Sequence, residues 1–339
     1  MKISVLGSGA WGTAITLLLR DNGHEVTLWS KFDGETETLG RSRENPLLPG
    51  VVIPGDVHIT SDIEEAAGSA GAVVLATPSF AVRETAELLR GRLADGCVAI
   101  CMSKGIEKDT SSLFSKILRD VLGERTPTAS VSGPTHAEEV ARKTPTACVA
   151  ASYDLAVAGH VQDLLMNEFL RVYTTDDVTG VELGGALKNV IALCAGICDG
   201  LGFGDNTMAM LMTRGVAEMA ELCVSMGGRK ETLAGLAGLG DLIVTCMSRH
   251  SRNRRAGVLI GKGMAAKDAM AEVGAVVEGY FAAAAARELS ISAGVEMPIC
   301  GEAYKVLYKN KNPLTAMKEL MARERKSETR SGEETWVTR

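Results

Sequence analysis

One lysine lies inside an otherwise apolar stretch. The segment GALKNVIALCAG, residues 185–196, holds Lys188 and Asn189 among residues typical of a buried helix. A lysine stem can run along apolar surface while its charge reaches water, which is the simplest interpretation of a single lysine. The alternative is a proton carrier in a closed site, because burial lowers the pKa of an ammonium group.

Small residues surround Lys188 if the segment is helical. Gly184, Gly185 and Ala192 then lie on its face of the helix. A lysine whose charge reaches solvent does not need small residues beside it, whereas a bound ligand or a second backbone that approaches closely does. We therefore favour the proton carrier, with helix-on-helix packing as the competing explanation of the small residues.

Two polar clusters further along the chain fit this chemistry. The stretch GLAGLGD, 235–241, leads to Asp241, and Thr245 follows one helical turn later, so we expect a carboxylate that pairs with or orients the lysine. The run SRNRR, 251–255, places three arginines after a candidate helix cap, Ser251. Guanidinium groups bind phosphate through paired hydrogen bonds, and the chain as a whole is acidic, so this run predicts a phosphate site.

The chain begins with a glycine-rich turn between a strand and a helix. GSGAWG, residues 7–12, has the G-x-G-x-x-G spacing and follows the apolar run ISVL. In this context the spacing predicts a dinucleotide site. Gly7 permits the tight turn, Gly9 lets the backbone approach a pyrophosphate, and Gly12 lets the helix pack closely. The free amides of the helix N-terminus would face the phosphates.

The end of the second predicted strand bears on the choice of dinucleotide. An NAD-selective site usually has an acidic residue there, which binds the ribose 2′-hydroxyl. This chain has Ser30 and Lys31 instead. A hydroxyl and a cation suit a 2′-phosphate, so we favour NADP(H), while the nearby Asp33 keeps NAD(H) open.

Further polar residues follow other strand ends, where ligands of open α/β sheets bind. Lys104 follows one predicted strand, and Thr135, His136 and Glu138 follow another. The T-x-x-E spacing of Thr135 and Glu138 predicts a capping box and a helix that begins there. His136 titrates near neutral pH, but the spacing gives it no partner, so we interpret it as structural or peripheral.

These residues require two different structural units. The first half alternates strand-like runs with helical patterns, which is typical of a doubly wound parallel sheet. The predicted strands are Ile3–Leu6, Glu25–Trp29, Ala72–Ala76, Val98–Cys101, Ala129–Val131, Thr146–Ala150 and Arg171–Thr174. From Val178 on, helical patterns follow one another. We therefore predict a Rossmann-type α/β unit over residues 1–177 and an all-α unit over 178–339, of which 323–339 is a charged tail expected to fray.

Composition narrows the function classes. The 339 residues carry a net charge of −6, which argues against nucleic acid and anionic membranes as partners. The eight cysteines form no C-x-x-C pair, so we expect no metal site. Glu182, Lys188 and glycines interrupt the longest apolar tracts, so we expect no membrane span and a cytoplasmic protein with reduced thiols.

Several motifs together resemble the bacterial NAD(P)-dependent glycerol-3-phosphate dehydrogenases. The most specific are SGPT at Ser132–Thr135, LGGALKNV at Leu183–Val190, GLGDL at Gly238–Leu242, SRNRR at Ser251–Arg255 and VVEG at Val276–Gly279. The resemblance spans nearly the whole chain. It implies reversible reduction of dihydroxyacetone phosphate to sn-glycerol 3-phosphate, which feeds glycerophospholipid synthesis, with Lys188 as the proton donor or acceptor at the reacting oxygen.

The resemblance also implies two sets of contacts. The implied substrate contacts are Lys104, Gly133, Thr135, Lys188, Asp241, Ser251, Arg252 and Asn253. The implied dinucleotide contacts, with the turn included, are Gly7, Gly9, Ala10, Trp11, Gly12, Lys31, Lys104, Ala137, Arg252, Val276 and Glu278. Three positions depart from the family's usual letters: Ala10 replaces serine, Lys31 replaces arginine or histidine, and His136 replaces phenylalanine.

The sequence leaves two other functions open. A two-domain dehydrogenase of 3-hydroxy acids would share the nucleotide turn and the lysine, but its substrate carboxylate needs no arginine-rich helix start. A non-catalytic NADPH sensor would keep the turn and have no use for Lys188, Asn189 and Asp241. A homodimer is open as well.

Overall fold

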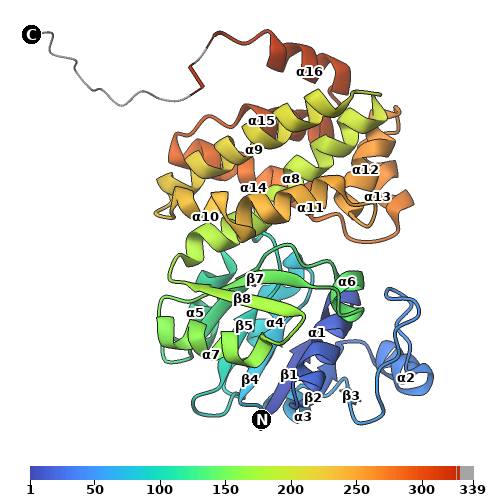
Figure 1. Cartoon of the computed structure of the whole chain (residues 1–339), viewed down its shortest axis with the longest axis vertical. Coiled ribbons are helices and arrows are strands. Elements are labelled where there is room, and N and C mark those ends of the chain that lie inside the picture. The colour runs from blue at the N-terminus through green and yellow to red at the C-terminus, as the bar shows by residue number, and fades with distance from the viewer. Residues whose placement is uncertain (326, 329–339) are drawn as a thin grey trace, which may run out of the picture.

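The chain forms an α/β unit followed by a helical unit (Figure 1). The computed structural model describes residues 1–325, 327 and 328. Most of the tail that is expected to fray, residues 326 and 329–339, therefore lies outside the described residues. The N-terminus lies at the end of the α/β unit that is farthest from the helices (Figure 1).

In the described residues the α/β unit has one eight-stranded sheet, in the order β3-β2-β1-β4-β5-β6-β7-β8. The strands are β1 (Lys2–Leu6), β2 (Glu25–Trp29), β3 (His58–Thr60), β4 (Ala72–Leu75), β5 (Val98–Cys101), β6 (Thr128–Ser132), β7 (Thr146–Ala151) and β8 (Leu170–Thr175). The predicted α/β class is confirmed. The sequence analysis missed β3, because three residues are too few to show an alternating pattern.

The sheet is parallel except at one place, which the alternation of strands and helices did not predict. β6 and β7 pair antiparallel, with Val131 opposite Ala150, and the other neighbouring strands pair parallel. A parallel connection needs a crossover of a dozen or more residues, usually a full helix. The chain between these two strands holds only the five-residue helix α6 (Ala137–Ala141), so β7 returns beside β6 in the opposite direction.

Helices cover both faces of the sheet. One face carries α1 (Ala10–Asp21), α6 and α7 (Leu155–Leu165), and the other carries α3 (Ile63–Ala67), α4 (Val82–Leu89) and α5 (Phe114–Leu122). Successive strand residues point to opposite faces, so Val5 joins the first core and Leu6 the second. The strands are apolar runs for this reason. The helix α2 (Asp33–Ser42) follows β2, and a short 3₁₀ turn, η1 (Ser79–Ala81), precedes α4.

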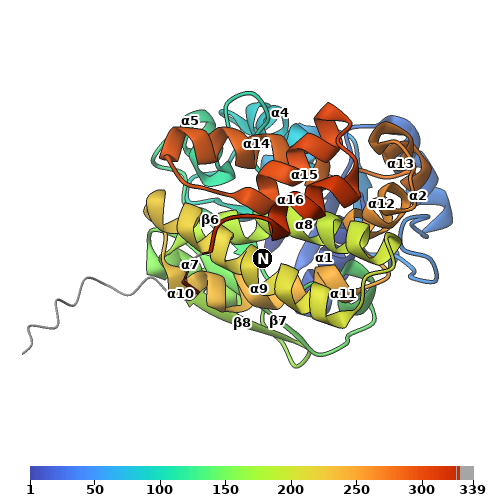
Figure 2. The same cartoon turned by 90° about the horizontal axis from the view of Figure 1, so that it is seen from above.

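The helical unit is built around α8 (Val178–Gly200). The other helical elements are α9 (Asp205–Ser225), α10 (Lys230–Ala234), the π-helical turn η2 (Leu236–Gly240), α11 (Asp241–Met247), α12 (Arg252–Gly261), α13 (Ala266–Val273), α14 (Glu278–Ala293), α15 (Pro298–Lys309) and α16 (Pro313–Met321). Figure 2 looks down on this unit from the side of α15 and α16. By length and composition α8 could cross a membrane, but 94% of its apolar window is buried inside the protein, which makes it a core helix.

Glycines let α12 lie directly against α8. A Cβ atom on Gly196 would meet the carbonyl oxygen of Arg254 at 2.0 Å, and one on Gly257 would meet that of Leu193 at 2.1 Å. The two backbones therefore touch, and no side chain larger than hydrogen fits between them. This contact fixes the start of α12, which carries the SRNRR run, relative to Lys188 on α8.

Candidate active site

Lys188 is buried and paired. Its side chain does not reach water, since the residue is only 6% exposed, so the solvent-seeking interpretation is wrong. Lys188 Nζ donates hydrogen bonds to Asp241 Oδ1 at 2.5 Å and to Thr245 Oγ1 at 2.7 Å. Both partners lie one turn apart on α11, and the expected pairing of the lysine with Asp241 is confirmed.

A second lysine reaches the same carboxylate from the α/β unit. Lys104, in the loop after β5, donates to Asp241 Oδ2 at 2.7 Å, to the Gly133 carbonyl at 2.8 Å and to Thr135 Oγ1 at 3.3 Å. Asp241 thus lies between two ammonium groups that belong to different units. The structure brings together five of the residues that the resemblance assigns to the substrate.

Burial and charge shift the pKa values of this cluster. Burial lowers the pKa of Lys188 to about 8; Asp241 opposes this shift and the neighbouring Lys104 adds to it. Burial alone would raise the pKa of Asp241, but the ammonium groups of Lys104 and Lys188 outweigh it and hold the pKa below its ordinary value. Near neutral pH the cluster therefore holds one carboxylate and a lysine that can exchange a proton at moderate cost.

The small residues beside Lys188 are explained by packing. A Cβ atom on Gly184 would lie 2.5 Å from the carbonyl oxygen of Ala237, and one on Gly185 would lie 2.6 Å from Ser132 Oγ. The glycines therefore admit η2 and the end of β6, as the competing explanation held. Because these elements close over α8, they also keep water from the lysine.

The predicted capping box does not form. α6 begins at Ala137 with His136 in the cap position, and no side chain caps it. Thr135 Oγ1 instead donates to the Gly133 carbonyl and accepts from Lys104. The T-x-x-E spacing was misleading because the threonine is drawn into the lysine cluster.

His136 lies close to the cluster, although no partner for it could be identified from the spacing. Burial lowers its pKa, and the charge of Lys188 acts in the same direction. Its ring lies 6.3 Å from that of His250, centroid to centroid, and its buried Nε2 has no hydrogen-bond partner in the described residues. Both effects favour the neutral form of the imidazole.

The glycine turn fits a dinucleotide. Gly7 has φ +118°, and a Cβ on it would lie 2.8 Å from the Ala76 carbonyl oxygen. A Cβ on Gly12 would lie 1.8 Å from the Gly7 carbonyl oxygen, whereas one on Gly9 would meet nothing within 4 Å. The turn is thus closed on the protein side and open above Gly9, where a pyrophosphate can approach the amides that begin α1 at Ala10.

Several buried polar atoms near the strand ends have no partner in the described residues. Among them are Trp11 Nε1, beside the turn, and Glu278 Oε2. The other oxygen of Glu278, Oε1, accepts a hydrogen bond from the Ser79 amide at 3.1 Å, which links α14 to the loop after β4. Val276 precedes this link. A donor and an acceptor of this kind suit a polar ligand between the two units.

The residues of the SRNRR run differ in their contacts. Ser251 caps α12, as predicted, by accepting from the Arg254 amide at 3.2 Å. Arg254 pairs with Asp199 at 2.7 Å. Asn253 is buried and joins α8 to α14, since it donates to Asn189 Oδ1 at 2.9 Å and accepts from the Gly279 amide at 2.8 Å. Arg252 is exposed and has no hydrogen bond or ion pair within the described residues, so it is available to an anion.

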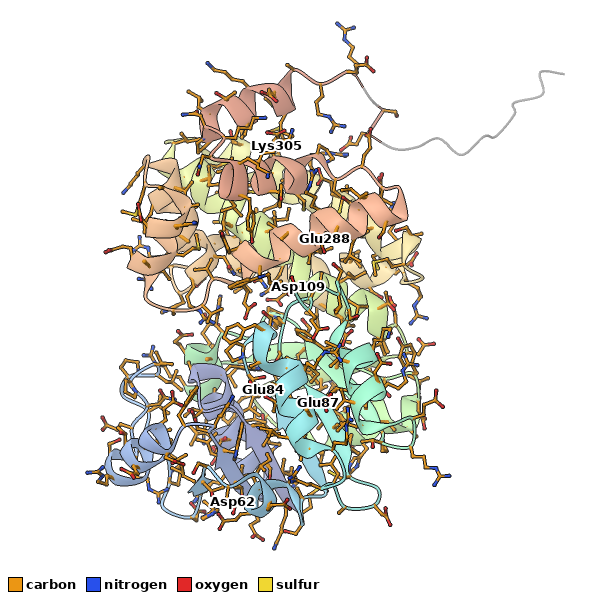
Figure 3. The ribbon with its side chains drawn as sticks, turned by 180° about the vertical axis from the view of Figure 1, so that it is seen from behind. Asp62, Glu84, Glu87, Asp109, Glu288 and Lys305 are labelled. Carbon is orange, nitrogen blue, oxygen red and sulfur yellow. The ribbon has the colours of Figure 1, made fainter. Side chains whose placement is uncertain are left out.

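The end of β2 holds a residue that the sequence analysis missed. Lys31 forms an ion pair with Glu84 of α4, which Figure 3 labels on the back of the molecule. Asp33 opens α2, but the carboxylate that reaches the strand end is that of Glu35, which accepts hydrogen bonds from Ser8 and Ser30. The available signal was its place in the first turn of the helix that follows β2.

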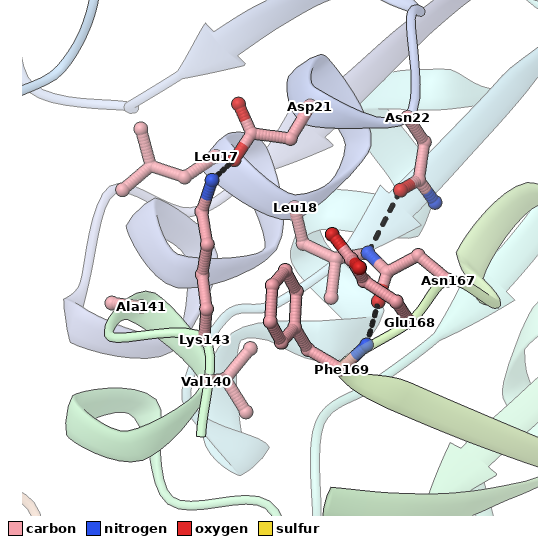
Figure 4. A pocket seen from close by; sticks show the side chains of 10 residues that line it. All are labelled: Leu17, Leu18, Asp21, Asn22, Val140, Ala141, Lys143, Asn167, Glu168 and Phe169. Carbon is pink, nitrogen blue, oxygen red and sulfur yellow. Dashed lines mark hydrogen bonds and ion pairs between the residues drawn. The ribbon is translucent and has the colours of Figure 1, made fainter. Parts of the chain in front are cut away.

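A hollow on the α/β unit lies apart from these residues (Figure 4). It is lined by the ends of α1 and α6 and by the loop before β8. Two pairs of its polar groups bond to each other: Lys143 pairs with Asp21 at 2.9 Å, and Asn167 donates to Asn22 at 2.8 Å. None of the residues that line the hollow belongs to the cluster around Lys188.

A doubly wound sheet with a glycine turn, joined to a helical unit that carries a buried lysine, is the architecture of a two-domain, nicotinamide-dependent dehydrogenase. Residues 2–158 match the family model of the NAD-dependent glycerol-3-phosphate dehydrogenase N-terminus, and residues 177–318 match that of its C-terminus. The chain belongs to the NAD-dependent glycerol-3-phosphate dehydrogenase family.

Individual relatives agree along the whole chain. The protein from Moorella thermoacetica named glycerol-3-phosphate dehydrogenase [NAD(P)+] is 49% identical over 333 residues, which cover 98% of this chain and 99% of that one. The protein of the same name from Fusobacterium nucleatum is 46% identical with the same coverage. The crystal structure of glycerol-3-phosphate dehydrogenase from Coxiella burnetii is 35% identical, with a TM-score of 0.91, and covers 95% of this chain and 99% of that chain.

Proposed function

We propose that this chain catalyses the reversible reduction of dihydroxyacetone phosphate to sn-glycerol 3-phosphate, with NADP(H) preferred to NAD(H). We further propose that it works in the cytoplasm, where it supplies glycerophospholipid synthesis. The observation that carries the proposal is the buried cluster of Lys188, Asp241 and Lys104, which lies where the α/β unit meets the helical unit. We set the boundary between the units at residues 177 and 178, where Asp177 caps α8 by accepting from the Gly180 amide.

The cluster accounts for proton transfer. When bound, the nicotinamide supplies or accepts the hydride at the carbon atom. Lys188 gives a proton to the carbonyl oxygen during reduction and takes it back during oxidation, and its lowered pKa suits both directions. Asp241 and Thr245 hold the ammonium in one orientation. Lys104 adds a second positive charge, which stabilises the negative charge that develops on the oxygen.

Binding is divided between the units. Arg252, exposed at the start of α12, binds the substrate phosphate, because a guanidinium matches phosphate with paired hydrogen bonds. The turn from Gly7 to Gly12 binds the pyrophosphate, with Trp11, Ala137, Val276 and Glu278 around the rest of the dinucleotide. Lys31 would leave Glu84 to bind the 2′-phosphate of NADP(H).

One assay tests the proposal. Purified protein is mixed with NADPH and dihydroxyacetone phosphate, and the absorbance of the reduced nicotinamide is followed. Steady oxidation that needs the phosphorylated substrate supports the proposal. NADPH binding without turnover would instead support a sensor, and turnover with a 3-oxo acid in place of the phosphate would support the related dehydrogenase.

A further inference from the structure

Glu35 connects the glycine turn to the end of β2. Its Oε2 accepts a hydrogen bond from Ser8 Oγ at 2.8 Å and another from Ser30 Oγ at 2.6 Å. Ser8 lies inside the G-x-G segment, and Ser30 is the first residue after β2. Both serines are buried, whereas Glu35 is exposed. A carboxylate on the solvent side thus closes the space between the two segments.

This space has a known use in Rossmann folds. The turn after the first strand and the end of the second strand flank the adenosine ribose, and an acidic residue at the strand end accepts its 2′-hydroxyl. Here the strand end has Ser30 and Lys31, and the carboxylate comes from the first turn of α2 instead. Glu35 Oε1 has no hydrogen bond within the described residues, so it is free to accept one.

We propose that Glu35 is a specificity-determining residue for the dinucleotide: its carboxylate accepts the ribose 2′-hydroxyl of NAD(H) and repels the 2′-phosphate of NADP(H). The inference rests on the proposed function, which assigns this site to a nicotinamide dinucleotide. Glu35 and Lys31 then act in opposite directions, and this opposition lets one site accept both dinucleotides.

The position of Lys31 supports this balance. Its ammonium is held by Glu84, and the two side chains are 49% and 58% exposed. An exposed ion pair contributes little to stability, so Lys31 can exchange Glu84 for a phosphate at low cost. The ammonium of Lys31 therefore acts on the ligand only when a 2′-phosphate is present. The carboxylate of Glu35 is in place without it.

The test compares Glu35→Gln with Glu37→Gln, a matched control. Glu37 lies on the same helix and is exposed, where it pairs with Arg41. Dissociation constants for NADH and NADPH are measured by calorimetry on wild type and both variants, with melting temperature as a separate readout. We expect Glu35→Gln to shift the ratio of the two constants toward NADPH by about tenfold, because a charge-assisted acceptor and a repulsive charge are lost together. Glu37→Gln should leave the ratio unchanged.

Two results would overturn the inference. If Glu35→Gln changes both dissociation constants equally, or lowers only the melting temperature, then Glu35 merely ties α2 to the turn. If the wild type binds neither dinucleotide, the proposed function fails together with this inference. The two failures are distinguishable, because only the second abolishes binding to the unmodified protein.

Discussion

The charged pair at the proposed proton site is buried, whereas the charged pair at the ribose end of the proposed nucleotide site is exposed. Lys188 and Asp241 are 6% and 1% exposed, and each has a charged partner at hydrogen-bond distance. Lys31 and Glu84 are also paired, but at the surface. Removing one partner of a buried pair costs about 3–5 kcal/mol, whereas a surface pair contributes about 0–1 kcal/mol. We therefore expect burial to fix the proton chemistry, and we expect a change of one exposed side chain to alter the choice of dinucleotide.

The largest effect is expected at the buried end. Lys188→Ala removes the proton carrier and leaves Asp241 paired with Lys104. We expect kcat to fall by about 10²–10⁴-fold, the usual contribution of a general acid or base. The dissociation constant for NADPH should stay nearly unchanged, because the proposal assigns the lysine to the reacting oxygen and not to the dinucleotide. A variant that keeps more than about a tenth of the wild-type kcat would contradict the assigned role.

The second largest effect is expected at the proposed phosphate contact, Arg252. A charge-assisted hydrogen bond contributes about 1.5–3 kcal/mol, so Arg252→Ala should lower kcat/KM for dihydroxyacetone phosphate by about one to two orders of magnitude. Arg252→Lys should restore activity only in part, because lysine lacks the planar fork. The comparison substrate is dihydroxyacetone, which has no phosphate and should respond much less.

The neighbouring Arg255 supplies the matched control. It is exposed on the same helix, and Arg255→Ala should leave kcat/KM near the wild-type value. Equal losses on both substrates in Arg252→Ala would instead assign Arg252 to the dinucleotide or to the start of α12. The phosphate contact would then have to come from Arg254 or Arg255.

A smaller and more selective change is expected at the surface. Lys31→Asp places a negative charge where the 2′-phosphate of NADPH would bind, so KM for NADPH should rise about tenfold more than KM for NADH. Glu84→Gln is the informative companion, since it frees Lys31 and should lower KM for NADPH slightly. A ratio of the two KM values that does not move in Lys31→Asp would mean that Lys31 does not contact the 2′-phosphate and stays with Glu84.

Features that depend on a short segment could be predicted from the sequence, whereas contacts between distant segments could not. The glycine turn and the Ser251 cap were predictable, because each shows its residue types in one short segment. Lys188 and Asp241 lie 53 residues apart, but each stands out as a charged residue in its own apolar or glycine-rich segment. The contact of Lys104 with Asp241 spans 137 residues and the antiparallel β7 depends on a short connection, so neither leaves a local signal. Thr135 is the opposite case, because its local sequence predicts a helix cap that does not form. Its hydroxyl contacts Lys104 instead.

Glu35 shows why the ribose end of the nucleotide site was harder to predict from the sequence. The usual pattern places the acid at the end of β2, where this chain has Ser30 and Lys31. Helix α2 folds back so that its third residue reaches the strand end, and a spacing rule does not describe that path. Because Ser30 donates to Glu35, the proposed preference for NADP(H) rests on Lys31, and the proposed role of Glu35 acts against it.

The pH dependence of the reaction in both directions tests the role of Lys188. Burial lowers its pKa to about 8, so the ammonium is present below that pH and is lost as the pH rises through it. Oxidation of glycerol 3-phosphate needs the neutral amine, and kcat/KM should rise through about pH 8. Reduction of dihydroxyacetone phosphate needs the ammonium, so its kcat/KM should fall over the same interval. In Asp241→Asn, which removes the carboxylate that raises this pKa, both transitions should move to lower pH. Flat profiles across this interval, or transitions that stay in place in Asp241→Asn, would contradict the assignment of the proton to Lys188.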